Sequence, residues 1–156
     1  MKLYLDIDGV LLTAKNPQAA EGAAEFVEFI TGHFDCYWLT THCQGNTDTA
    51  LRYLSDYFDD ATMERLQSIK PTRWETLKTD GIDFNSRFVW IDDYAMQAEK
   101  TMLKQHNASD SLILVDLYGI NNLKTIMKRL LNLTLFSNEP RQQTSVYKSK
   151  KNKIEI

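Results

Sequence analysis

The chain has 156 residues, of which 43% are hydrophobic and 25% are charged, values that are ordinary for one globular domain with a hydrophobic core. No apolar stretch is long enough to span a bilayer, and the amino-terminal residues carry two acids after a short apolar strand, unlike a signal peptide. Two cysteines, Cys36 and Cys43, are too few for a disulfide framework. We therefore expect a cytoplasmic protein with reduced thiols and no membrane partner.

Apolar runs and helical periodicities alternate along the chain, which predicts a parallel sheet with right-handed crossovers. The fold class that follows is α/β, a single Rossmann-like three-layer α/β/α domain over residues 1–136. Residues 61–86 are expected to hold only helical pieces, and the paired acids Asp59 and Asp60 are expected to be solvated at a helix end. The predicted strands are 2–7, 34–40, 87–92 and 111–116, and the predicted helices are 19–31, 47–57, 94–105 and 121–132.

The net charge of −3 is unevenly distributed. Residues 137–156 carry five basic and two acidic side chains, so an acidic body is followed by a basic tail. We expect this tail to be a flexible, solvated terminus. The alternative is that it contacts nucleic acid or another acidic partner.

Two apolar strands each end on paired carboxylates. Asp6 and Asp8 close the first strand, and Asp92 and Asp93 close the run Phe88–Val89–Trp90–Ile91. Unpaired buried charge is costly, so acids in such places are usually exposed, paired or bound to a metal. In a parallel sheet the four carboxylates would meet at the carboxyl edge, where ligands bind. Clustered oxygen ligands there suit Mg²⁺.

The segment Asp6–Ile7–Asp8–Gly9–Val10 resembles motif I of the haloacid dehalogenase (HAD) superfamily. The resemblance implies that Asp6 is a nucleophile that forms an aspartyl-phosphate and that Asp8 is the general acid and base. The spacing is consistent with this chemistry, because one carboxylate must attack phosphorus while a second acid protonates the leaving oxygen. The second acid favours phosphoryl transfer over dehalogenation.

Further segments resemble the remaining HAD motifs in order. Tyr37–Trp38–Leu39–Thr40 resembles motif II, which implies that the Thr40 hydroxyl contacts the phosphoryl group, with Thr41 as second choice. The motif III lysine should neutralise phosphate and nucleophile. Lys78 is the favoured candidate and Lys70, which precedes a proline, is the alternative.

Trp90–Ile91–Asp92–Asp93 resembles motif IV in its Asp-Asp form. The resemblance implies that Mg²⁺ is held by Asp6, by the backbone carbonyl of Asp8 and by Asp92, while Asp93 ligates directly or supports the other ligands. His42 and Cys43 follow Thr40 and are expected to border the site. The tryptophans Trp38, Trp74 and Trp90 are expected in the core.

The chain leaves little room for a cap domain. Residues 9–39 must hold a crossover helix, and residues 42–69 suffice for helices but not for a separate domain. We therefore expect a small capless HAD-like phosphatase whose open site suits a phosphorylated protein or nucleic-acid end. Two alternatives are a nucleic-acid end-processing phosphatase and a non-catalytic HAD-like binding or regulatory domain, because a fold alone does not prove activity. The oligomeric state is not predicted.

Overall fold

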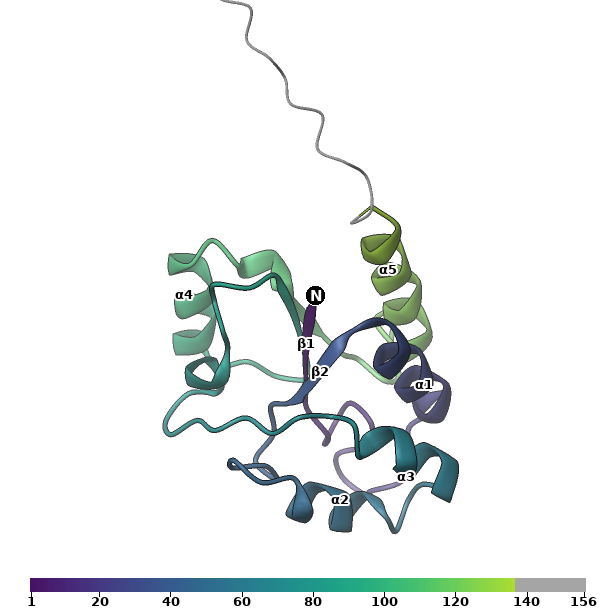
Figure 1. The fold of residues 1–156 in the computed structure, drawn as a ribbon. Helices are drawn as coiled ribbons and strands as arrows, with labels where there is room; N and C mark the ends of the chain where they lie inside the picture. The colour runs from purple at the N-terminus through teal and green to yellow at the C-terminus, as the bar shows by residue number, and fades with distance from the viewer. Residues whose placement is uncertain (137–156) are drawn as a thin grey trace, which may run out of the picture.

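Four parallel strands form the central sheet of the computed structural model, which describes residues 1–136 (Figure 1). Their order is β2-β1-β3-β4, so β1 and β3 lie side by side in the middle. The α/β class and the parallel sheet predicted from the sequence are confirmed. The strands are β1 (Lys2–Leu5), β2 (Asp35–Trp38), β3 (Phe88–Asp92) and β4 (Leu112–Leu114).

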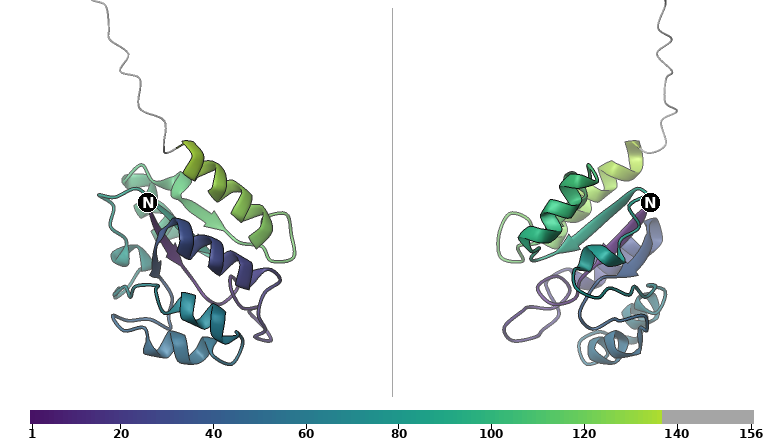
Figure 2. Two further views of the ribbon diagram at one scale, coloured as in Figure 1. Left: turned by 45° about the vertical axis from the view of Figure 1, so that its right-hand side comes forward. Right: turned by 90° about the vertical axis from the view of Figure 1, so that its left-hand side faces the viewer.

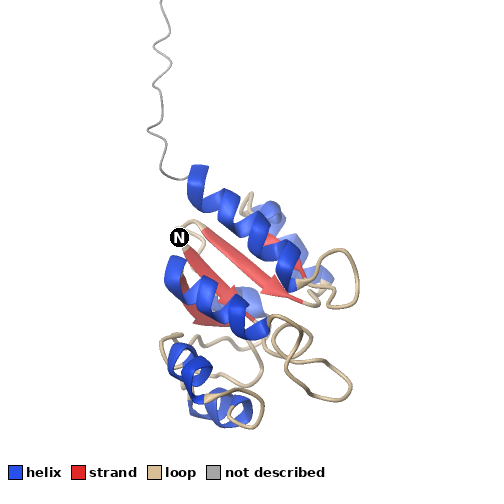
Figure 3. Cartoon of the chain, turned by 90° about the vertical axis from the view of Figure 1, so that its right-hand side faces the viewer, coloured by secondary structure: helices blue, strands red, loops and turns tan. Residues whose placement is uncertain are grey.

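Helices cover both faces of this sheet and give three layers. α1 (Ala23–His33) and α5 (Leu123–Phe136) lie on one face (Figure 3), and α4 (Gln97–Gln105) lies on the other (Figure 2). The connection from β2 to β3 holds two short helices, α2 (Asp48–Leu54) and α3 (Asp60–Leu66), and α3 packs against α1. Two 3₁₀ turns, η1 (Lys78–Gly81) and η2 (Ser109–Ser111), precede β3 and β4.

Alternating side chains of the central strands fill two separate cores. Leu3 and Leu5 of β1 point into the larger core, which includes residues of α1 and α5. Tyr4, between them, joins Trp90 and Leu103 in the smaller core on the α4 side. Because side chains alternate across a strand and both faces are covered, these strands are apolar at nearly every position.

The elements are shorter than predicted where the chain turns early. β1 ends at Leu5 rather than residue 7, because the carbonyl of Ile7 accepts hydrogen bonds from the amides of Val10, Leu11 and Leu12 in a tight turn. α1 begins only at Ala23, after Gly22 with a φ of 75°. Only a glycine adopts that conformation at little cost, so it separates the loop from the helix.

The paired acids after β2 are exposed, as predicted, but their place in the fold is a correction. Asp59 is the residue directly before α3 rather than the end of a helix, and its carboxylate accepts a hydrogen bond from the amide of Thr62 at 2.9 Å. This is a helix N-cap, and it lowers the pKa of Asp59.

No helix within residues 1–136 has both the length and the apolar character needed to cross a membrane. The basic tail predicted at residues 137–156 lies outside the described residues.

Candidate active site

The register of the two central strands brings two of the predicted acids together. Leu5 pairs with Ile91, and the amide of Asp6 donates to the carbonyl of Ile91 at 3.0 Å, so Asp6 lies beside Asp92 at the carboxyl edge. Both residues are buried, with 7% of Asp6 and 1% of Asp92 exposed when backbone and side chain are counted together. Two buried carboxylates whose oxygens lie within 4.8 Å of one another repel each other, and a cation between them would offset this repulsion.

The cation is Lys78. Its Nζ lies 2.7 Å from Oδ2 of Asp92 and 3.0 Å from Oδ2 of Asp6. The two carboxylates raise the pKa of Lys78 although its burial acts in the opposite direction, so the ammonium stays charged. Lys70 instead pairs with Asp35 of β2 at 2.7 Å, where both side chains are exposed. Of the two candidate lysines, the favoured one is therefore the one that reaches the acids.

Glu99, on α4, holds the backbone of Lys78 in place and was not predicted from the sequence. It is 2% exposed, and its carboxylate accepts hydrogen bonds from the amides of Lys78 and Met96, each at 2.8 Å. A buried acid that accepts two backbone hydrogen bonds links η1 to the start of α4. In the sequence it is indistinguishable from an ordinary helical glutamate.

Asp93 completes a group of three carboxylates. Single ligand atoms of Asp6, Asp92 and Asp93 all lie within 4.8 Å of one another. Gly9 packs directly on Asp93: its φ is +75°, and a Cβ at this position would overlap the Asp93 carboxylate. Glycine is therefore required in the turn after β1 both for its conformation and for this close approach.

The charge balance of this group suits a divalent cation. Three carboxylates face one ammonium, and burial together with the charge of Asp6 raises the pKa of both Asp92 and Asp93. A cation with two positive charges would offset the excess, and hard oxygen ligands within reach of one another are the donors that such ions prefer. The residues present therefore fit a metal of this class.

Asp8 points to different partners. His42 Nε2 lies 2.7 Å from its Oδ2, and the hydroxyl of Tyr53 donates to its Oδ1 at 3.0 Å. The His42 and Tyr53 rings are stacked with centroids 4.3 Å apart. Burial and the contact with Asp8 raise the pKa of Tyr53 to about 12. Three of the four predicted carboxylates therefore form the cluster, and the Asp8 side chain contacts His42 and Tyr53 instead. The predicted metal contact through the backbone carbonyl of Asp8 stays a prediction.

The two threonines after β2 have different environments. Thr40, the favoured candidate, is fully buried, and its hydroxyl accepts a hydrogen bond from the amide of His42 at 3.4 Å. Thr41, the second choice, is exposed and lines a pocket with the acids. Cys43 was expected to border the site, which is wrong: it is fully buried in the larger core, with Sγ near the carbonyl of Thr72.

A pocket of about 260 Å³ opens beside the carboxylates. Trp74 is half-buried in its wall, a correction to the core position predicted for it, whereas Trp38 and Trp90 are fully buried as predicted. Tyr94 is 66% exposed and Met96 is 40% exposed. Nine residues line this pocket: Asp6, Thr41, Trp74, Lys78, Asp92, Asp93, Tyr94, Met96 and Glu99.

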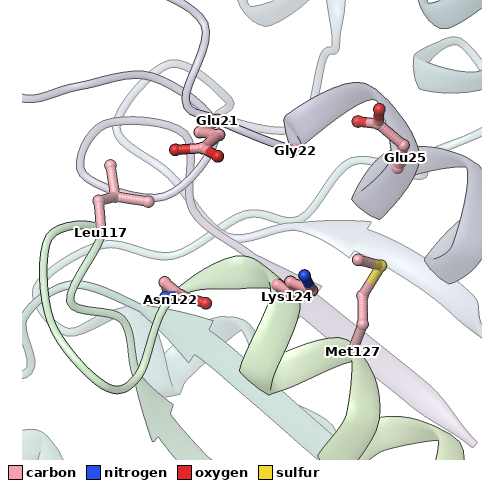
Figure 4. Close-up of a pocket in the computed structure, with 7 residues that line it drawn as sticks. All are labelled: Glu21, Gly22, Glu25, Leu117, Asn122, Lys124 and Met127. Carbon is pink, nitrogen blue, oxygen red and sulfur yellow. The ribbon is translucent and has the colours of Figure 1, made fainter.

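A second pocket, of about 310 Å³, lies between the start of α1 and the first turns of α5 (Figure 4). Glu21, Glu25 and Lys124 line it, and none of the three clustered carboxylates does. The acidic group therefore belongs to the pocket on the α4 side of the sheet.

Comparisons of the chain with family models, curated proteins and solved structures found no match. The resemblance to the HAD superfamily stays a prediction from motifs.

Proposed function

We propose that the protein is a Mg²⁺-dependent phosphatase of the HAD type, which hydrolyses phosphomonoesters through an aspartyl-phosphate intermediate. The observation that carries the proposal is the group of three carboxylates at the sheet edge with Lys78 Nζ 2.7 and 3.0 Å from two of them. An arrangement with a nucleophilic carboxylate, a cation and a metal site is what phosphoryl transfer requires.

In the proposed reaction the Asp6 carboxylate attacks phosphorus and the bond to the leaving oxygen breaks as Asp8 gives it a proton. Water then attacks the phosphorus of the aspartyl-phosphate, Asp8 takes up the proton, and phosphate leaves while the Asp6 carboxylate is restored. Lys78 offsets negative charge on the phosphoryl oxygens, and a threonine hydroxyl orients them: Thr40 by motif position, or Thr41 by its place in the pocket. Mg²⁺ held by Asp6, Asp92 and Asp93, with the Asp8 carbonyl, would supply further stabilisation of that charge.

An open site supports a large substrate, such as a phosphorylated protein or a nucleic-acid end. In the described chain the segment between β1 and α1 is a loop, and the segment between β2 and β3 holds two seven-residue helices. The cytoplasm stays the proposed location, supported by Cys36 and Cys43, which are buried free thiols.

The aromatic wall of the pocket favours a second candidate, a nucleic-acid end-processing phosphatase. Tyr94 is 66% exposed and Trp74 is half-buried, and both line the pocket with the acids. Exposed rings beside a phosphate site can stack against bases, and stacking tolerates any base sequence. The basic residues of 137–156 would add non-specific attraction to the phosphate backbone.

The test is hydrolysis of an aryl phosphate with and without Mg²⁺, with Asp6→Asn as the control. Turnover that requires Mg²⁺ and is lost in Asp6→Asn supports the phosphatase. Retained turnover in Asp6→Asn contradicts the assignment of the nucleophile. Binding of Mg²⁺ without hydrolysis of aryl phosphate, phosphopeptide or phosphorylated oligonucleotide favours the non-catalytic alternative. Comparing hydrolysis of the phosphopeptide with that of the phosphorylated oligonucleotide separates the general phosphatase from the nucleic-acid end-processing phosphatase.

A further inference from the structure

The contacts of Asp8 with His42 and Tyr53 are not explained by the metal group or by the motif resemblance. Asp8 lies at the start of the turn after β1, His42 lies in the loop after β2, and Tyr53 belongs to α2. Each of the two carboxylate oxygens has its own partner, at 2.7 and 3.0 Å. Three separate elements therefore converge on one side chain.

Ring packing supports the two partners of Asp8. The His42 and Tyr53 rings stack with centroids 4.3 Å apart and an interplanar angle of 19°, and the Tyr53 and Tyr57 rings meet edge to face with centroids 5.7 Å apart. Tyr53 and Tyr57 also pack against the larger core. The two groups that contact Asp8 are thus held by the body of the protein and not by Asp8 alone.

A carboxylate in this position needs such support. The last torsion of an aspartate side chain is broad, so a carboxylate that is 40% exposed, as Asp8 is, has many orientations open to it in water. Proton transfer requires the donor oxygen to lie within hydrogen-bond distance of the leaving oxygen in a suitable orientation. A hydrogen bond to each oxygen fixes the plane of the carboxyl group.

We propose that His42 and Tyr53 are positioning residues that orient the Asp8 carboxyl group for proton transfer to the leaving oxygen. The inference rests on the proposed function, because it assigns a role within that reaction. It also defines which substrates depend on the pair. Alkyl phosphates, whose alkoxide is a poor leaving group, need the proton of Asp8, whereas a nitrophenolate leaves readily without it.

The experiment measures kcat/KM for an alkyl phosphate and for nitrophenyl phosphate, with Mg²⁺, in variants that remove one contact at a time. Tyr53→Phe deletes the hydroxyl but keeps the ring stacked on His42, and His42→Gln keeps a polar nitrogen while His42→Ala does not. Tyr57→Phe is the matched control, because it removes a hydroxyl from the neighbouring ring without touching Asp8. Since kcat/KM reports on the steps up to departure of the leaving group, later hydrolysis of the aspartyl-phosphate does not enter.

We expect Tyr53→Phe and His42→Ala to lower kcat/KM for the alkyl phosphate by roughly tenfold or more, the usual effect of removing one hydrogen bond to a carboxyl group that becomes charged as it gives up its proton. The value for nitrophenyl phosphate should fall by less than about twofold, since general acid catalysis contributes little when the leaving group is good. Tyr57→Phe should change neither, and His42→Gln should recover part of the loss of His42→Ala.

Equal losses on both substrates, or no loss on either, would overturn the positioning role while leaving the phosphatase intact. If the wild-type protein turns over neither of these substrates, nor a phosphopeptide or a phosphorylated oligonucleotide, the proposed function fails and the positioning role fails with it. A variant that does not fold is replaced by the milder change at the same position. If the milder variant loses as much activity on nitrophenyl phosphate as on the alkyl phosphate, the result counts against the proposal.

Discussion

Replacing Lys78 by methionine removes the cation between two buried carboxylates and keeps most of the packing volume. The side chains are 14% exposed for Lys78, 10% for Asp6 and 1% for Asp92, so solvent screens them little. Breaking a buried ion pair by removing one partner typically costs about 3–5 kcal/mol, because the remaining charge is left uncompensated. We therefore expect Lys78→Met to lower the free energy of unfolding by roughly this amount at neutral pH without added metal.

The matched control is Lys70→Met, which removes the same type of side chain from a pair of the same length. Lys70 and Asp35 lie 2.7 Å apart but are 55% and 42% exposed. Surface pairs contribute little, so this variant should unfold close to wild type. Urea denaturation followed by circular dichroism measures both losses. A loss in Lys70→Met equal to that in Lys78→Met would refute the reasoning from burial.

The pH dependence of this loss has a defined sign. Burial and the charge of Asp6 already raise the pKa of Asp92, and removing Lys78 takes away the contact that opposes them. An acid whose folded pKa lies above its unfolded pKa destabilises the fold at high pH, and this cost disappears as pH falls and the acid binds a proton. The difference in the free energy of unfolding between wild type and Lys78→Met should therefore become smaller as the pH is lowered from neutral. A difference in unfolding free energy that does not change with pH would contradict the role of Lys78 in keeping Asp92 ionised.

Three further changes probe other parts of the account. Gly9→Ala, which puts a side chain at φ +75° against Asp93, should lower stability by at least about 1–3 kcal/mol in the same urea assay; wild-type stability would contradict the close packing. Asp83→Asn removes the contact with Lys2 that lowers the pKa of Asp83, so its destabilisation should be full near neutral pH. It should begin to shrink only below about pH 4, where the acid binds a proton in the unfolded chain, and disappear only as pH falls through the lower pKa of the folded protein. Trp74→Ala should raise KM for a phosphorylated oligonucleotide more than for a phosphopeptide; equal changes would count against base stacking.

The architecture could be predicted from the sequence because its determinants are local and periodic. Apolar runs such as Phe88–Val89–Trp90–Ile91 have few other places in a globular fold than a sheet covered on both faces. The sequence also predicted that Asp6 and Asp92 lie close together, because parallel strands that each end on an acid bring these acids to the same edge of the sheet. Their order in the sheet, with β1 beside β3, placed the acids as direct neighbours.

What the sequence left open depends on contacts between distant loops. Residue type alone does not distinguish Lys78 from Lys70, and only the path of the chain through η1 brings Lys78 to Asp92. Glu99 and Tyr53 have no sequence signal, because a helical glutamate and a helical tyrosine are most often an exposed acid and a packed ring. Glu99 acts by accepting a hydrogen bond from the amide of Lys78, and Tyr53 acts by donating one to the carboxylate of Asp8. Both partners belong to other elements of the fold.

The central claim is that Asp6 is the nucleophile, and a covalent intermediate tests it most directly. A single turnover with a phosphomonoester labelled in the phosphoryl group, quenched with acid and followed by peptide mapping, should place the label on the peptide that contains Asp6. The label should be absent in Asp6→Asn and should not accumulate without Mg²⁺. Label on a different residue, or steady turnover with no trapped phosphoprotein, would contradict the proposed mechanism.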